Sequence, residues 1–266
     1  TRNCLQDCGI ESRKEKSIVY IMGGDFKSPI SPLDCGNSGT TTRLLSGLLS
    51  GQEMDVQLMG DESLSARPMG RIILPLTEMG AEISCNDCKL PLSISSKSLN
   101  GIEYTLPVAS AQVKSSIMFA ALGAMSKTKI VEPVKTRDHS EIMLESLGVE
   151  ISVNKNEILV SPLKGKLNSF ELTVPGDPSS AAFFATAAAM IPNSDLTIKN
   201  ISANPTRVGF FHALEKMGGG VIWKNLHHEC GELVGDVQIY YQPLHGITIS
   251  KDQVPSLIDE LPIIAV

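Results

Sequence analysis

The sequence predicts an α+β fold built from repeated units of about 70 residues, and three observations support this prediction. Four similar segments contain Gly9, Gly80, Gly148 and Gly218, so the steps between these glycines are 71, 68 and 70 residues. Strand-like stretches follow most of the glycines. Segments rich in Ala, Ser and Thr alternate with the first kind of segment. Each unit therefore carries two helices and several strands, and the 266 residues hold roughly 3.8 units.

The first kind of segment is typical of an amphipathic helix that ends at a C′ glycine. Apolar residues at helical spacing precede the glycines at 72–79, 143–147 and 210–217. We expect these helices to begin near Pro68, at a capping box that starts with Asp138, and near Pro205. Pro75 lies inside its helix and predicts a kink. Strands are expected at 17–22, 150–153, 157–160 and 221–223.

The second kind of helix begins with hydroxyl or carboxylate side chains and continues with small residues. Its starts lie at 37–43, 110–116 and 177–180, and a fourth is expected at 255–260. Small side chains favour close packing between such helices within a shared core. The dense turn at 175–178 is the expected hinge, so we predict a first domain at 1–174 and a second domain at 175–266.

Composition excludes several classes of protein. With 42% hydrophobic and 20% charged residues the chain can bury a core, and a net charge of −6 without a basic run excludes a general nucleic-acid binder. No apolar run reaches the roughly 20 residues of a membrane span. The first residues resemble neither a signal nor a transit peptide. We expect a cytoplasmic monomer without membrane or nucleic-acid partners, and a fragment that is truncated at both ends.

No metal site is expected. Cys85 and Cys88 have the spacing of zinc ligands, but a second pair is missing nearby, so we interpret them as reduced thiols in a turn. The histidines form no HExxH motif, and the chain has no Walker A, dinucleotide-binding or GxSxG motif.

Candidate ligand-binding residues lie at the helix starts. A helix N-terminus offers free N–H groups to an anion, and Gly39 allows a ligand to approach the backbone closely. Ser110 and Gln112 can donate hydrogen bonds to a phosphate or hydroxyl group. Arginines, which bind carboxylates and phosphates in a bidentate manner, recur at or near these starts as Arg43, Arg67, Arg137 and Arg207. The alternatives are ordinary N-capping and solvated surface charges.

A candidate base lies near the end of the chain. Asp259 and Glu260 are surrounded by apolar residues. The residues leave two interpretations open, a favourable first-turn charge of a helix or a partly desolvated general base.

Six ordered segments resemble one family. They are LDCGNSGTTTRLLSG at 33–47, GDESLSARPM at 60–69, SAQVKS at 110–115, TRDHSE at 136–141, PGDPSSAA at 175–182 and IDELP at 258–262. Together they resemble the bacterial type of 5-enolpyruvylshikimate-3-phosphate synthases. The resemblance implies a two-domain enolpyruvyl transferase fold that resembles an inverse α/β barrel. Each domain has three βαβαββ units, of which this chain would hold about four of six.

The resemblance also implies a reaction without metal or cofactor, in which enolpyruvate moves from phosphoenolpyruvate to the 5-hydroxyl of shikimate 3-phosphate and phosphate leaves. By resemblance, Gly39 and Arg67 bind phosphoenolpyruvate and Asp259 is the base at the 5-hydroxyl. Shikimate 3-phosphate is assigned to Ser110, Ala111, Gln112 and Arg137. The family's first Lys-Ser motif and its later Lys, Glu and Arg groups have no match here, so we expect the chain alone to be inactive.

Two alternatives remain. The enzymes that transfer enolpyruvate to UDP-N-acetylglucosamine share the fold, but their reactive cysteine precedes the Ala-Arg-Pro stretch, where this chain has no cysteine at 61–65. The other alternative is a non-catalytic fragment or a degenerate paralogue that binds ligand without turnover.

Overall fold

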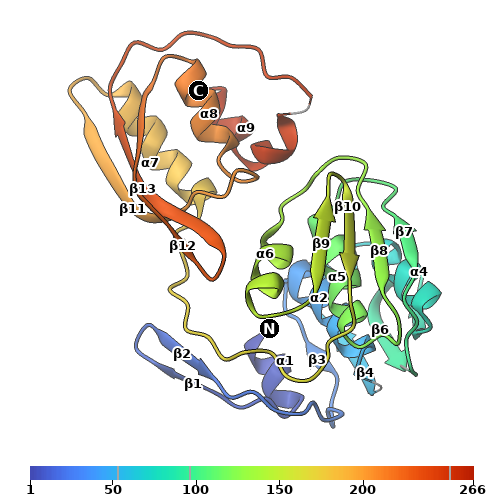
Figure 1. The fold of residues 1–266 in the computed structure, drawn as a ribbon. Coiled ribbons are helices and arrows are strands. Elements are labelled where there is room, and N and C mark those ends of the chain that lie inside the picture. The colour runs from blue at the N-terminus through green and yellow to red at the C-terminus, as the bar shows by residue number, and fades with distance from the viewer. Residues whose placement is uncertain (53, 96, 252) are drawn as a thin grey trace. The chain divides into compact units, whose positions relative to one another are not determined.

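The computed structural model describes residues 1–52, 54–95, 97–251 and 253–266. Its chain groups into two compact units (Figure 1). Unit 1 comprises Thr1–Lys135 and Val149–Lys166, and unit 2 comprises Thr136–Gly148 and Leu167–Val266. The predicted domains at 1–174 and 175–266 differ from these units by assigning 136–148 and 167–174 to the first domain. That division stays a prediction for the whole protein.

Unit 1 contains two four-stranded sheets with the same strand order. The first sheet has the order β3-β4-β6-β5, made of β3 (Leu33–Asp34), β4 (Asp55–Met59), β5 (Glu82–Asn86) and β6 (Lys89–Ser95). The second has the order β7-β8-β10-β9, made of β7 (Glu103–Thr105), β8 (Thr128–Val131), β9 (Ile151–Asn154) and β10 (Glu157–Val160). In both sheets the first two strands are parallel and the remaining pairs are antiparallel.

Helices connect these strands in the same order in both sheets. The parallel strands are joined by α2 (Gly39–Ser50) or α5 (Ala111–Leu122), and the hairpin is preceded by α4 (Gly70–Met79) or α6 (His139–Ser146). The predicted βαβαββ repeat is therefore confirmed, with α6 grouped into unit 2. The short α3 (Glu62–Ser65) precedes α4, and α1 (Arg2–Asp7) precedes a hairpin of β1 (Ser12–Glu15) and β2 (Ile18–Ile21).

The four repeated glycines end helices as predicted. Gly9, Gly80, Gly148 and Gly218 follow α1, α4, α6 and α8 (Gly209–Lys216), with φ values of 85°, 114°, 94° and 95°. A left-handed backbone strains other residues much more than glycine, so the pattern marks these ends correctly. Pro75 lies inside α4, and the kink stays a prediction.

Three of the four helices of the second kind also begin as predicted, because a side chain caps each of these three. Ser38, Ser110 and Asp177 accept hydrogen bonds from backbone N–H groups in the first turns of α2, α5 and α7 (Pro178–Met190). In unit 1, α2 and α5 pack directly on each other, and a Cβ built on Gly47 would lie 2.0 Å from the backbone oxygen of Ser116. The predicted close packing of small residues is confirmed for this pair.

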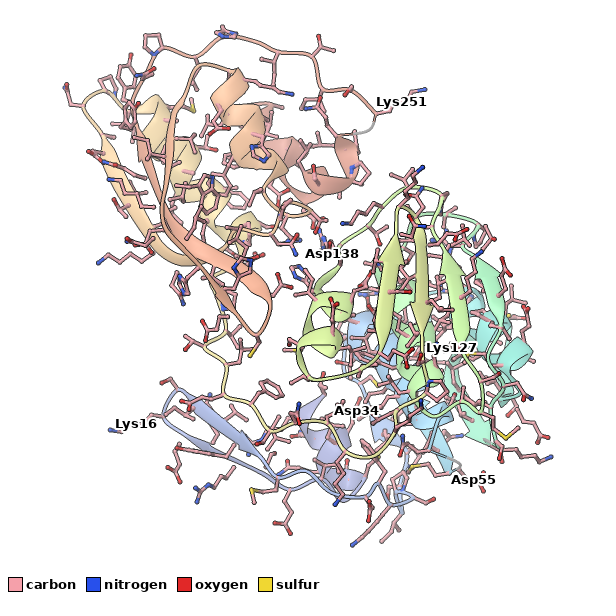
Figure 2. The ribbon with its side chains drawn as sticks, in the orientation of Figure 1. Lys16, Asp34, Asp55, Lys127, Asp138 and Lys251 are labelled. Carbon is pink, nitrogen blue, oxygen red and sulfur yellow. The ribbon has the colours of Figure 1, made fainter. Side chains whose placement is uncertain are left out.

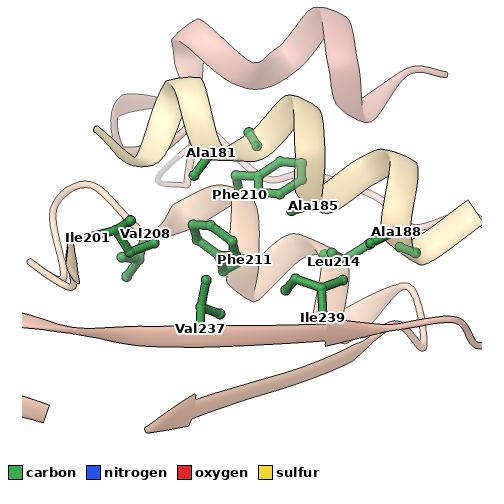
Figure 3. Close-up of a cluster of buried hydrophobic side chains, with 12 residues drawn as sticks. Ala181, Ala185, Ala188, Ile201, Val208, Phe210, Phe211, Leu214, Val237 and Ile239 are labelled. Carbon is green, nitrogen blue, oxygen red and sulfur yellow. The ribbon is translucent and has the colours of Figure 1, made fainter. Parts of the chain in front are cut away.

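Unit 2 packs α7 and α8 against an antiparallel sheet. Its order is β11-β13-β12, made of β11 (Asp195–Ser202), β12 (Gly220–Glu229) and β13 (Glu232–Tyr240). Alanines of α7 meet Phe210 and Phe211 of α8 and the β13 residues Val237 and Ile239 in the core (Figure 3). Phe211 also contacts Trp223 edge to face, with ring centroids 5.4 Å apart. Alanine on one helix leaves space for phenylalanine on the next, which gives dense packing.

The fourth helix of the second kind begins later than the sequence predicts. Residues 255–260 form two 3₁₀ turns, Val254–Ser256 and Ile258–Glu260, and α9 follows at Leu261–Ile264. Pro262 explains the difference, because a proline inside a continuous helix from 255 would lack its N–H bond and clash with the carbonyl of Ile258. In the first turn of α9 the proline is well tolerated.

Two further features bear on the sequence expectations. All six cysteines are free; the exposed Cys88 lies in the turn that joins β5 to β6 as expected, whereas Cys85 lies in β5 and not in the turn. None of the helices in the described ranges combines the length and the apolar character that a bilayer crossing requires.

Candidate functional site

A cationic cluster in unit 1 lies at the N-terminus of α2. Ser38 caps this helix, and buried Gly39 is its first residue. A Cβ built on Gly39 would lie 2.7 Å from Nη1 of Arg43 and 3.5 Å from Nη1 of Arg67. Both guanidinium groups therefore lie over the backbone of Gly39. A side chain at this position would displace Arg43, so the close approach itself requires glycine.

The cluster extends from α2 to the start of α5. Arg43 donates from Nη1 to Oε1 of Gln112 at 2.7 Å, and Nε2 of Gln112 donates to Oγ1 of Thr40 at 2.8 Å. Burial lowers the pKa of Arg43, and the charges of Arg67 and Arg71 lower it further. The positive charges of Arg67 and Arg71 therefore favour the binding of an anion beside Arg43. The sequence showed Arg43 among the cations at helix starts but did not assign it to the site.

Arg67 is oriented by neutral groups. Its Nη2 donates to Oδ1 of Asn37 at 2.5 Å and lies 3.5 Å from Oγ of Ser63. Asn37 in turn donates to Oδ2 of Asp61 at 2.7 Å. Asp61 caps α3, and the Leu64 N–H together with Asn37 holds the pKa of this carboxyl below its usual range. Because an amide oxygen carries no net charge, it leaves the positive charge of Arg67 available to an anionic ligand.

Ser110 and Ala111 stand at the start of α5. Oγ of Ser110 accepts the N–H of Val113 at 3.4 Å, which is the capping role that the sequence left open. A hydroxyl that accepts a hydrogen bond can also donate one. Ala111 is the first residue of α5, and Gln112 follows it in the first turn. In unit 1 the structure therefore brings Gly39, Arg67 and Gln112 to Arg43.

A second cluster, in unit 2, surrounds Asp259. Nη2 of Arg137 contacts Oδ2 of Asp259, and Nη1 of Arg207 lies 3.8 Å from the same oxygen. The side chain of Asp259 is 53% exposed, whereas the adjacent Glu260 is buried. Asp259 lies in a 3₁₀ turn. Its two neighbouring guanidinium groups, rather than a helix N-terminus, define its surroundings.

A polar network that the sequence did not indicate lies beside Arg137 along the chain. Nδ1 of His139 lies 2.5 Å from Oε1 of Glu232, and Asn204 donates to Glu232 at 3.0 Å and to Asp138 (Figure 2) at 2.8 Å. Burial opposes ionisation of Glu232, but the contacts with His139 and Asn204 outweigh it and hold the pKa of this carboxyl low. No local sequence pattern pairs His139 with Glu232, because 93 residues separate them.

The described residues contain no group of three or more His, Cys, Asp or Glu side chains arranged to hold a metal ion. The two clusters instead offer arginine, amide, hydroxyl and backbone N–H donors in unit 1, and a carboxylate between two arginines in unit 2. The first set suits a carboxylate or phosphate group, and the second can accept a proton from a hydroxyl group.

Comparisons with known proteins point to one family. The family model described as EPSP synthase (3-phosphoshikimate 1-carboxyvinyltransferase) matches residues 1–266. The 3-phosphoshikimate 1-carboxyvinyltransferase of Persephonella marina is 46% identical over 274 residues, which cover 100% of this chain and 63% of that protein. The protein of the same name from Ruthia magnifica is 48% identical over 269 residues, which cover 99% of this chain and 61% of that protein.

Solved structures agree with the sequence relatives. An EPSP synthase structure from Acinetobacter baumannii superposes with a TM-score of 0.90 at 41% identity, covering 98% of this chain and 60% of the other. The chain thus spans between 60% and 63% of the length of these three relatives.

Proposed function

The chain belongs to the EPSP synthase (3-phosphoshikimate 1-carboxyvinyltransferase) family, and on that premise we propose that the whole protein transfers enolpyruvate from phosphoenolpyruvate to shikimate 3-phosphate. The observation that carries the proposal is the pair of guanidinium groups over Gly39. Arg43 and Arg67 bind neutral amide oxygens, so their charge is available to the carboxylate or phosphate of phosphoenolpyruvate.

The proposed roles follow the chemistry of each side chain. Gly39 offers its backbone at a helix N-terminus, and Arg67 supplies a bidentate clamp for phosphoenolpyruvate. Ser110, Ala111 and Gln112 bind shikimate 3-phosphate at the start of α5, and Arg137 binds its phosphate. No metal or cofactor is part of the proposal.

Asp259 is the proposed general base. It takes the proton of the 5-hydroxyl as that oxygen attacks C2 of phosphoenolpyruvate, and a separate general acid of the whole protein protonates C3, which gives a tetrahedral intermediate. The conjugate base of that acid then removes a proton from C3 as the bond between C2 and the phosphate oxygen breaks, so that phosphate leaves and the enolpyruvyl ether forms. The contact between Arg137 and Asp259 supports this assignment, because it brings the proposed phosphate clamp to the proposed base. We also propose that the protein is a cytoplasmic monomer and that its two domains meet between residues 174 and 175.

Steady-state kinetics of the full-length protein tests the proposal through phosphate release. We expect release with phosphoenolpyruvate and shikimate 3-phosphate together, and none when UDP-N-acetylglucosamine replaces shikimate 3-phosphate. Asp259→Asn should lower kcat about 10²–10⁴-fold with little change in KM, because the proton acceptor is lost. Arg67→Ala should weaken phosphoenolpyruvate binding about 10- to 100-fold, because charge-assisted hydrogen bonds are lost.

Arg13→Ala is the matched control, because Arg13 is 67% exposed and pairs with Glu15 on the β1–β2 hairpin. It should leave both kinetic constants unchanged. Release with neither acceptor would favour a paralogue that binds ligand without turnover. An unchanged kcat in Asp259→Asn would reject Asp259 as the base.

A further inference from the structure

Arg207 is the second arginine of the cluster around Asp259. It lies between β11 and α8, and only 11% of its side chain is exposed. Its Nη2 donates to Oδ1 of Asp177 at 2.5 Å and to Oγ of Ser179 at 3.0 Å. Its Nη1 lies 3.8 Å from Oδ2 of Asp259. One largely buried guanidinium group therefore connects the start of α7 to the proposed base.

Hydrogen bonds to the first residues of α7 and its N-cap hold this guanidinium group in place. Oδ2 of Asp177 accepts both the backbone N–H and the hydroxyl of Ser180 at 2.9 Å, while Oδ1 accepts from Arg207. Burial opposes ionisation of Asp177, but the bonds from Ser180 and the charge of Arg207 outweigh it and hold the pKa of this carboxyl low. Asp177 thus stays charged, and a charged N-cap fixes one edge of the planar Arg207 fork.

Arg137 is more exposed than Arg207, so it can exchange its contact with Asp259 for a contact with substrate. Its side chain is 36% exposed, and under the proposed function it binds the phosphate of shikimate 3-phosphate. When the phosphate engages Arg137, Asp259 shares that partner with a dianion. Arg207 remains in place, because Asp177 and Ser179 hold it from the other side.

We propose that Arg207 is a positioning residue that keeps the Asp259 carboxylate directed at the substrate hydroxyl while Arg137 binds the substrate phosphate. The proposal rests on the proposed function. The 3.8 Å separation suits this role, because it orients the carboxylate electrostatically without a direct hydrogen bond. The lone pairs of Asp259 remain available to accept the hydroxyl proton.

Kinetics of the full-length protein with Arg207→Met tests the proposal. A carboxylate that loses its orientation by about 1 Å loses up to roughly 10²-fold in rate, so kcat should fall about 10- to 100-fold. KM for both substrates should change less than about threefold, because Arg207 acts through Asp259. Arg207→Lys keeps the charge without the planar fork and should recover part of kcat. The exposed-arginine control Arg13→Met should retain wild-type constants.

A double-mutant cycle separates positioning from a general structural role. If Arg207 acts only through the carboxylate, Arg207→Met should cost nothing further in an Asp259→Asn background. An equal loss in both backgrounds would overturn the proposal, as would a raised KM for shikimate 3-phosphate with kcat unchanged. An Asp259→Asn protein with normal kcat would instead reject the proposed function, and this inference with it.

A second route keeps the test decisive if Arg207→Met does not fold. Asp177→Asn retains a competent N-cap but removes the charge that anchors Arg207. It should lower kcat less than Arg207→Met is expected to, again without effect in the Asp259→Asn background. Unchanged kcat in both Asp177→Asn and Arg207→Lys would overturn the proposal.

Discussion

Gly47→Ala tests whether the contact between α2 and α5 sets the geometry of the cationic cluster. The added Cβ would lie 2.0 Å from the backbone oxygen and 2.6 Å from the carbonyl carbon of Ser116, whereas 3.4–4 Å is ordinary contact. Backbone atoms on a packed helix cannot rotate aside, so the two helices must separate by about 1 Å.

Separating α2 from α5 at Gly47 also affects the cationic cluster, which lies one helical turn away. Arg43 lies four residues before Gly47, and Gln112 lies four residues before Ser116, so the 2.7 Å bond between Arg43 and Gln112 spans the same helix pair. A shift of about 1 Å breaks that bond and can cost up to about 10²-fold in rate. Overpacking costs about 1–3 kcal/mol, which exceeds the gain of about 0.5–1 kcal/mol from replacing a helical glycine.

We therefore expect kcat/KM for phosphoenolpyruvate to fall about 10- to 100-fold in the full-length variant, with a net loss in stability of about 1–2 kcal/mol. Steady-state kinetics and urea unfolding measure the two effects. Gly70→Ala is the matched control, because a Cβ there meets Cys88 at an ordinary 3.6 Å, so this variant should keep the wild-type kcat/KM and lose no stability. A Gly47→Ala protein that is as active as the wild type and more stable would refute the reasoning.

Two further predictions concern stability. Lys114→Met removes a fully buried ammonium that lies 3.2 Å from the buried carboxylate of Glu132, so the free energy of unfolding in urea should fall by about 3–5 kcal/mol. The control Lys129→Met, whose side chain is 32% exposed, should lower it by at most about 1 kcal/mol. Equal losses in the two variants would contradict this reasoning. Asp177→Ala should lose about 0.5–2 kcal/mol of helix capping that Asp177→Asn retains. Because the pKa of Asp177 in the folded protein lies below its ordinary 3.8, its charge stabilises the fold above about pH 4. The difference in unfolding free energy between wild type and Asp177→Asn should therefore shrink as the pH falls further. A difference that does not change with pH would be the contrary result.

Features encoded by neighbouring residues could be predicted from the sequence. A glycine after an amphipathic segment is enough to mark a helix end, and all four repeated glycines adopt a positive φ. Hydroxyl and carboxylate caps at Ser38, Ser110 and Asp177 likewise depend on residues within three positions. The prediction failed for the helix at 255–260, where Pro262 delayed the start of α9.

Contacts between distant residues could not be predicted in this way. Arg43 meets Gln112 across 69 residues, and His139 meets Glu232 across 93. No pattern within one segment indicates such partners. The resemblance to a family supplied Gly39, Arg67 and Gln112 as a group, but it left Arg43 and Arg207 without roles.

The four arginines at helix starts look alike in sequence, yet their partners separate them into two kinds. Arg43 and Arg67 bind neutral amides, so their charges remain available to an anion. Arg137 and Arg207 both lie against Asp259, so part of their charge is matched by a carboxylate. A count of cations would assign all four to substrate. The contacts instead favour anion binding for the pair in unit 1. In unit 2 the proposed roles divide, because Arg137 exchanges its contact with Asp259 for the substrate phosphate, whereas Arg207 stays with the carboxylate.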